Sequence, residues 1–224
     1  MTLKATEIPL DPQPKSDKWS DITRLTEWEE EFYDVYTARK YGKWVMLKTL
    51  KPQYKEVPEF RIMLEKEFEA RYNLANPHIV MINDLEEVPA LGRSIIMDDV
   101  YGDSLRKLID EHRVTPQVIE RLRTQLPVAL DYIQSNHIVH HPIRPETIIF
   151  TENVGNLKLI DVGFDQKNHL DAAETANDIK SYGQVLIEAM NAAGYDDSLL
   201  RSVADRCVRG RIDSIYGLNL ALAD

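Results

Sequence analysis

Three histidines lie close together in the sequence and are the first candidates for metal binding or acid–base chemistry. His137, His140 and His141 are followed at once by Pro142 and Arg144. A zinc site needs tetrahedral ligands, often with cysteine or carboxylate partners, and the neighbouring guanidinium would repel a cation. We therefore expect no metal here, although His141 could serve as a substitute base near neutral pH.

Two further sets of potentially reactive residues give weaker evidence for a functional site. Asp98 and Asp99 are adjacent in a strand-like stretch, so their side chains face opposite ways and cannot form an acid–base pair. Cys207 is the single cysteine, which excludes an internal disulfide and fits a reducing compartment. The chain has no apolar run of about 18 residues and no signal-peptide pattern at its start, so we expect a cytoplasmic protein outside the membrane.

The 224 residues carry a formal net charge of −10, which argues against general binding to nucleic acid or to an anionic membrane. The net charge does not exclude binding by one local basic patch, but the simplest interpretation of this patch is a solvated helix face. It consists of Arg201, Arg206, Arg209 and Arg211. The length fits one domain or one two-lobed unit.

The predicted secondary structure, which must position any site, changes along the chain from mainly strands to mainly helices. Residues 1–18 read as an extended leader. The pattern of the next eighty residues predicts a small antiparallel sheet with one helix. The expected strands lie at 33–38, 43–50, 80–85 and 94–100, and the helical spacing lies at 59–75. The rest is mainly helical, with helices at 105–109, 115–133, 177–192 and 197–208 and two short strands at 147–150 and 157–160. The predicted class is α+β, and a cleft between the two parts is the expected place for a ligand.

Six segments line up in order with the signature motifs of protein kinases, and together they resemble a minimal bacterial-type Ser/Thr pseudokinase domain. They are VMLK at 45–48, NPHIV at 76–80, MDDVYG at 97–102, HHPIRPET at 140–147, DVG at 161–163 and DIKSYG at 178–183. The resemblance implies a protein-kinase-like bilobal fold with an N-lobe at 19–98 and a truncated, mainly helical C-lobe at 99–224.

The resemblance also implies a vestigial ATP site. Its members would be Lys48 as the phosphate-binding lysine, Glu67 as its helix partner, Asp161 as the metal-binding carboxylate and Arg144 in place of the catalytic-loop lysine, together with Met46 and Ile149. Lys48 and Glu67 would equally well form a purely structural ion pair. Glu65 and Glu69 are alternative partners, and Arg71 stands where the family packs an apolar residue.

The departures from the family pattern decide the functional expectation. Pro142 replaces the catalytic aspartate and has neither an acid nor a base, while Thr147 replaces the asparagine that holds a second magnesium ion.

The glycine-rich loop is replaced as well. Its three glycine positions hold Trp28, Glu30 and Tyr33, and the run 29–31 places three carboxylates where a triphosphate would lie. Met46 replaces a small alanine and should fill part of the adenine space.

We therefore expect a catalytically inactive pseudokinase that acts as a binding, scaffold or regulatory module for another protein. We expect no nucleic-acid or membrane partner and no firmly held cofactor. The alternative is an atypical kinase-like protein that binds ATP and magnesium at low affinity, with residual or non-standard phosphotransfer. A third reading is a regulatory domain of a longer protein.

Overall fold

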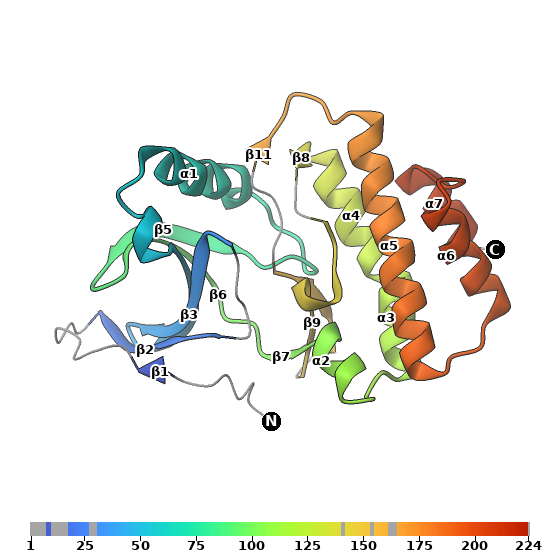
Figure 1. Cartoon of the computed structure of the whole chain (residues 1–224), viewed down its shortest axis with the longest axis horizontal. Helices are drawn as coiled ribbons and strands as arrows, with labels where there is room; N and C mark the ends of the chain where they lie inside the picture. Colours follow the sequence, from blue (N-terminus) through green and yellow to red (C-terminus); the bar gives the residue numbers. More distant parts are fainter. Residues whose placement is uncertain are drawn as a thin grey trace. The chain divides into compact units, whose positions relative to one another are not determined.

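A computed structural model describes residues 8–9, 18–26, 31–139, 142–152, 155–160 and 165–223, and it divides into two compact units (Figure 1). The first unit comprises residues 1–75 and 80–100, and the second comprises residues 76–79 and 101–224. The α+β class predicted from the sequence is confirmed, because strands dominate the first unit and helices the second.

Within its described residues, the first unit is one antiparallel sheet of six strands in the order β1-β2-β3-β4-β6-β5. The strands are β1 (Ile8–Pro9), β2 (Trp19–Arg24), β3 (Tyr33–Lys40), β4 (Lys43–Leu50), β5 (Ile82–Val88) and β6 (Gly92–Asp98). A 3-10 turn, η1 (Pro52–Tyr54), leads into helix α1 (Pro58–Tyr72), which packs against β4 and β5. The sheet and its helix thus bring β4 and α1 together.

The second unit is built around helix α5 (Ala172–Ala193), which lies between the other long helices of this unit (Figure 1). Its remaining helical elements are α2 (Leu105–Asp110), α3 (Pro116–Thr124), α4 (Leu126–Ser135), η2 (Pro145–Thr147), α6 (Ser198–Val208) and α7 (Ile215–Ala223). Its strands are β7 (Gly102–Ser104), β8 (Ile138–Val139), β9 (Ile148–Thr151), β10 (Leu157–Leu159) and β11 (Asp165–Gln166). No helix in these described stretches is long and apolar enough to cross a bilayer.

Local sequence explains several of these boundaries. Thr115 caps α3 by accepting a hydrogen bond from Val118 N, and Pro116 occupies the first helical position. The single helix expected at 115–133 is two helices that meet at Gln125, because Pro127 lacks the N–H that a continuous helix would need.

Helix α5 begins five residues before the predicted start. Asp171 accepts a hydrogen bond from Glu174 N at 2.8 Å, and Glu174 Oε2 accepts one from Asp171 N at 3.0 Å. This reciprocal capping box satisfies the first amides of the helix. Residues 173–175 therefore lie in the first turn of α5.

Helices α5 and α6 come into close contact at Gly183. A Cβ atom placed there would lie 2.6 Å from Ala204 O and 2.8 Å from the Cβ of Cys207. The absence of a side chain at this position is what lets the two helices touch. Burial in this interface raises the pKa of the Cys207 thiol to about 11, so it is protonated near neutral pH and is no nucleophile.

Tyr182 provides a test of this helical core. Its side chain is fully buried, and its hydroxyl has no hydrogen-bond partner within the described residues. A buried unsatisfied hydroxyl costs about 1–3 kcal/mol. We expect Tyr182→Phe to raise the free energy of unfolding by about 1 kcal/mol in urea titrations.

The matched control is Tyr216→Phe, because Tyr216 on α7 is exposed and its change should stay within about 0.5 kcal/mol. A loss of stability in Tyr182→Phe would show that the hydroxyl does have a partner in the folded chain.

Candidate functional site

Lys48 lies in the middle of the first unit's sheet and is almost completely buried. It stands on β4, opposite Val35 on β3 and Ile95 on β6, with 2% of its side chain exposed. Its Nζ donates a hydrogen bond to Glu67 Oε1 on α1 at 3.0 Å. The salt bridge expected for these two residues is therefore present, and it joins the sheet to the helix.

Helical spacing explains why Glu67 is the partner. Leu64, Glu67 and Arg71 follow one another at intervals of three and four residues and are all buried, so they share one face of α1. Glu65 and Glu69 lie off that face and are exposed. Of the three acids considered in the sequence, Glu67 is the one that contacts Lys48.

Arg71 turns the pair into a group of three. Its Nη1 donates to the same Oε1 of Glu67 at 2.8 Å, and Arg71 and Glu67 are each 1% exposed. The second oxygen, Oε2, has no hydrogen-bond partner among the described residues. One carboxylate oxygen is therefore shared by two buried cations, which the sequence analysis did not predict.

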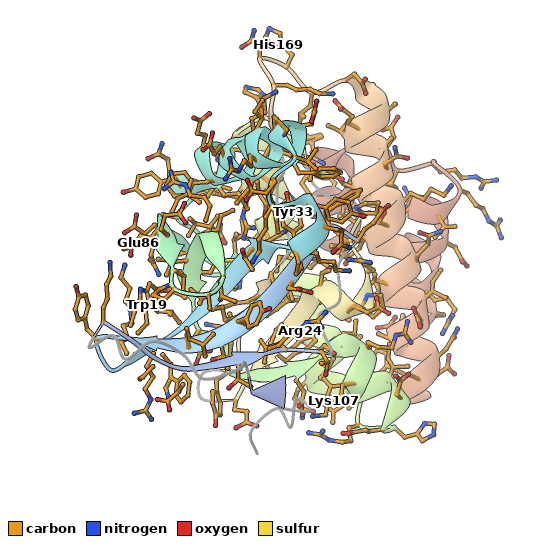
Figure 2. All side chains as sticks on the ribbon, turned by 60° about the vertical axis from the view of Figure 1, so that its left-hand side comes forward. Trp19, Arg24, Tyr33, Glu86, Lys107 and His169 are labelled. Atoms are coloured by element: carbon orange, nitrogen blue, oxygen red, sulfur yellow. The ribbon has the colours of Figure 1, made fainter. Side chains whose placement is uncertain are left out.

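Tyr33 covers the ammonium from another side. This residue, labelled in Figure 2, is the first of β3 and stands at the third glycine position of the expected loop. It lies two residues before Val35, the cross-strand neighbour of Lys48, so its side chain reaches the same face of the sheet. Its ring centroid lies 4.3 Å from Lys48 Nζ, and the side chain is 4% exposed. The ring makes a cation–π contact. The side chain that replaces glycine thus contacts the lysine itself.

Phe32 fixes this segment to the start of α1. Its ring packs against Tyr54 of η1 and Phe60 of α1, with centroid distances of 5.4 and 4.9 Å. Its backbone carbonyl accepts a hydrogen bond from Lys51 N at 2.9 Å. These contacts fix Phe32, the residue before Tyr33, against η1 and the start of α1. Trp28 and Glu30, with Glu29, lie outside the described residues, whereas Glu31 is described and exposed.

Met46 lies two residues before Lys48 on β4, opposite Thr37 and Met97. Only 1% of it is exposed, so it belongs to the packed interior of the first unit. The expectation that Met46 fills part of the adenine space stays a prediction.

The other predicted site residues belong to the second unit. Pro142 and Arg144 are exposed, and Ile149 is fully buried on β9. Thr147 ends the η2 turn, where its Oγ1 donates to Arg144 O at 3.0 Å. The hydroxyl at the position of the family's metal-binding asparagine therefore has a local structural bond.

Arg106 stabilises the same turn and was missed in the sequence analysis. Its guanidinium pairs with Glu146 in η2 at 2.9 Å and with Glu188 on α5 at 2.8 Å. Burial opposes the charged form of Glu146, but the hydrogen bond from Arg106, a backbone hydrogen bond and the nearby guanidinium charges together outweigh burial and hold the carboxyl pKa below its usual value. The turn that follows the catalytic-loop position is thus tied to two helices.

Three of the sequence-based candidates cannot be placed. Asp161, His140 and His141 lie outside the described residues. Among the residues that are described, no three His, Cys, Asp or Glu side chains come close enough together to hold a metal ion.

The fold and these motif residues define the class of protein. A family model of the protein kinase domain matches residues 31–190, and the chain belongs to this family. Several of the relatives that it matches are bacterial serine/threonine kinases. The chain is 32% identical to the serine/threonine-protein kinase PknD of Mycobacterium tuberculosis over 123 residues, which are 54% of this chain and 18% of that protein. It is 33% identical to a probable serine/threonine-protein kinase of Clostridium acetobutylicum over 138 residues, 60% of this chain and 20% of the relative.

The matched regions therefore span about a fifth of these curated relatives. Among solved structures, the PknI kinase domain of Mycobacterium tuberculosis superposes with a TM-score of 0.67 at 18% identity, covering 94% of this chain and 99% of that one. Rad53 in complex with AMP-PNP gives a TM-score of 0.70 at 17% identity, covering 91% and 66%. These likenesses establish the protein-kinase-like fold.

Proposed function

We propose that this protein-kinase-like domain does not transfer phosphate and acts as a regulatory binding module for another protein. The observation that carries the proposal is the ring of Tyr33 over Lys48. A lysine that binds phosphates must present its ammonium to the ligand. Here a buried aromatic ring takes the place of the loop glycine and contacts that ammonium.

Moving the ring aside would be costly. It would break a cation–π contact, which is worth up to about 2 kcal/mol when desolvated. It would also expose an aromatic side chain that is now 96% buried, the complement of its 4% exposure. The described residues therefore fit ATP poorly in the arrangement that the family implies.

The chemistry supports the same proposal. Pro142 cannot accept the proton of a substrate hydroxyl, and loss of a general base costs about 10²–10⁴ in rate. Thr147 Oγ1 donates its hydrogen to Arg144 O, which fixes the hydroxyl in the turn. Pro142 therefore lacks the carboxylate, and Thr147 lacks the amide, that phosphotransfer uses at these two positions.

One observation favours the alternative of an ATP-binding protein with low affinity or residual activity. The Lys48–Glu67 contact of 3.0 Å is the pair that kinases need for nucleotide binding. In this alternative Lys48, Arg144 and Asp161 would hold the nucleotide, and Asp161 would carry the magnesium ion. The intact pair is equally what a structural role of Lys48 and Glu67 requires.

A nucleotide titration separates the two. If the dissociation constant for ATP with magnesium exceeds about 1 mM, then about 1 mM nucleotide stabilises the fold by at most about 0.4 kcal/mol, a rise of roughly 1–2 °C in Tm. A constant of about 10 µM would give about 2.7 kcal/mol and roughly 5–10 °C. We expect the smaller shift, together with no radiolabel transfer from ATP to the chain or to a generic protein substrate.

Tyr33→Gly is the informative variant. Removing the ring should expose Lys48 and increase the nucleotide-dependent shift, while transfer stays absent because Pro142 is unchanged. A large shift in the unmodified chain, lost in Lys48→Ala and in Asp161→Ala, would establish the ATP-binding alternative instead.

A further inference from the structure

Four arginines line a hollow on the surface of the second unit. The hollow has a volume of about 380 Å³ and runs along α6 and the turn that follows it. Its basic members are Arg201, Arg206, Arg209 and Arg211, joined by the hydroxyls of Ser198 and Ser202. We call this surface the α6 arginine groove.

The fold of α6 places these side chains on one surface. The helix buries Leu200, Val203, Ala204 and Cys207, and the groove residues at 198, 201, 202, 205, 206 and 209 follow the opposite stripe. After the helix Gly210 adopts a positive φ of 66°, which reverses the chain. Arg211 N then donates to Arg206 O at 2.8 Å, and the fourth arginine returns beside the second.

The charges of the groove are not balanced. Elsewhere arginines such as Arg106, Arg113 and Arg123 have carboxylates within 3.0 Å. In the described part of the chain none of the four groove arginines has such an ion pair, and Arg201 instead donates to Asn191 Oδ1 at 2.8 Å. Asp196 and Asp205 also line the groove. Four guanidinium groups against two carboxylates leave a local excess of two positive charges in a chain of net charge −10.

The helix dipole accounts for only part of this arrangement. Cations in the last turn of a helix interact favourably with its C-terminal carbonyls, which suits Arg206 and Arg209. Arg201 stands near the start of α6, where the dipole disfavours a positive charge, and Arg211 lies beyond the helix. The dipole therefore does not explain why all four arginines face one hollow.

We propose that the α6 arginine groove binds a phosphorylated peptide segment of a protein partner. A phosphoryl group carries about −1.5 to −2 charges near neutral pH, which matches the local excess. Guanidinium forks bind phosphate oxygens through paired hydrogen bonds, and the two serine hydroxyls can donate as well. A singly charged carboxylate would gain less against the repulsion from Asp196 and Asp205.

The size of the groove also fits a peptide. The eleven residues of α6 span roughly 16 Å at 1.5 Å per residue, which is the reach of about five residues of extended chain. Duplex nucleic acid binds through many phosphate contacts spread over a basic face, whereas this acidic chain offers one short patch. The inference names a partner class for the proposed binding role, but it does not depend on the loss of phosphotransfer.

The test is fluorescence anisotropy with a labelled peptide of roughly nine residues carrying one central phosphoserine. We expect saturable binding that weakens at least tenfold without the phosphate and at least tenfold in Arg206→Gln/Arg211→Gln. Arg93→Gln is the matched control, because Arg93 is an exposed arginine on β6 of the first unit. It should bind like the unmodified chain.

Thermal midpoints of both variants should match that of the unmodified chain, so that a loss of binding reports the groove. Equal binding of the unphosphorylated peptide, or full binding by the double variant, would overturn the proposal. Complete competition by inorganic phosphate at millimolar concentration would show a small-oxyanion site, and tighter binding of an RNA duplex would show a nucleic-acid site; either result would also overturn it. Radiolabel transfer is assayed separately on the same proteins, so failure here leaves the proposed lack of phosphotransfer untouched.

Discussion

Replacing Glu67 by glutamine should lower the free energy of unfolding by about 3–5 kcal/mol, because it removes the buried carboxylate charge to which two buried cations donate. Lys48 and Arg71 both donate to Oε1 of Glu67, at 3.0 and 2.8 Å, from an interior that exposes at most 2% of any of the three side chains. Glutamine retains an acceptor oxygen of similar shape but removes the only negative charge in this trio.

The measurement is the midpoint of urea unfolding with its slope, in the unmodified chain and in Glu67→Gln. Glu65→Gln is the matched control, since Glu65 is an exposed acid on the same helix and its replacement should change stability by no more than about 0.5 kcal/mol. Equal stability of the two variants would mean that the carboxylate of Glu67 contributes nothing to the fold.

The residues of this group show how far the sequence could predict the site. Lys48 and Glu67 follow from motif and spacing, and the contact between them is present. For Tyr33 the sequence predicted only that a side chain replaces glycine. Its position over Lys48 depends on the pairing of β3 with β4, which a linear pattern does not specify.

Arg71 is a case in which the signal was available. Glu67 and Arg71 stand four residues apart on a helix, the spacing at which opposite charges meet. From the sequence, Arg71 was noted only as a charged residue at a position where the family packs an apolar one. Its almost complete burial was the part that could not be predicted, because arginine side chains usually lie at the surface.

The secondary structure likewise contains elements that the sequence predicted and elements that it did not. Strands β3 and β4 were predicted closely because apolar residues and a turn at Tyr41-Gly42 mark them. Strand β5 was predicted at 80–85 but spans Ile82–Val88, since its charged residues lie at an edge of the sheet, where charge is tolerated. Helix α7 was missed because it is apolar without a helical period.

The capping signal at Asp171 and Glu174 was present in the sequence and would have given the start of α5. Short-range patterns thus accounted for most elements and would also have given the start of α5. The position of Tyr33 over Lys48, by contrast, depends on tertiary contacts.

A triple replacement can decide whether the buried charges of Lys48, Glu67 and Arg71 are needed for the stability of the fold. Lys48→Met, Glu67→Leu and Arg71→Met combined would replace the whole group by apolar side chains of similar volume. Such replacements of buried ion groups are often neutral or stabilising by about 1–4 kcal/mol. We therefore expect the triple variant to be more stable than Glu67→Gln by at least about 3 kcal/mol in urea titrations.

Removing one charge and removing all three should therefore have different effects on stability. If the triple variant folds as well as the unmodified chain, the ion group is not required for stability. If instead the triple variant is as unstable as Glu67→Gln, the salt bridges themselves hold α1 to the sheet. Nucleotide binding is decided separately by the ATP titration, because Lys48→Met removes both the ammonium and its contact with Tyr33.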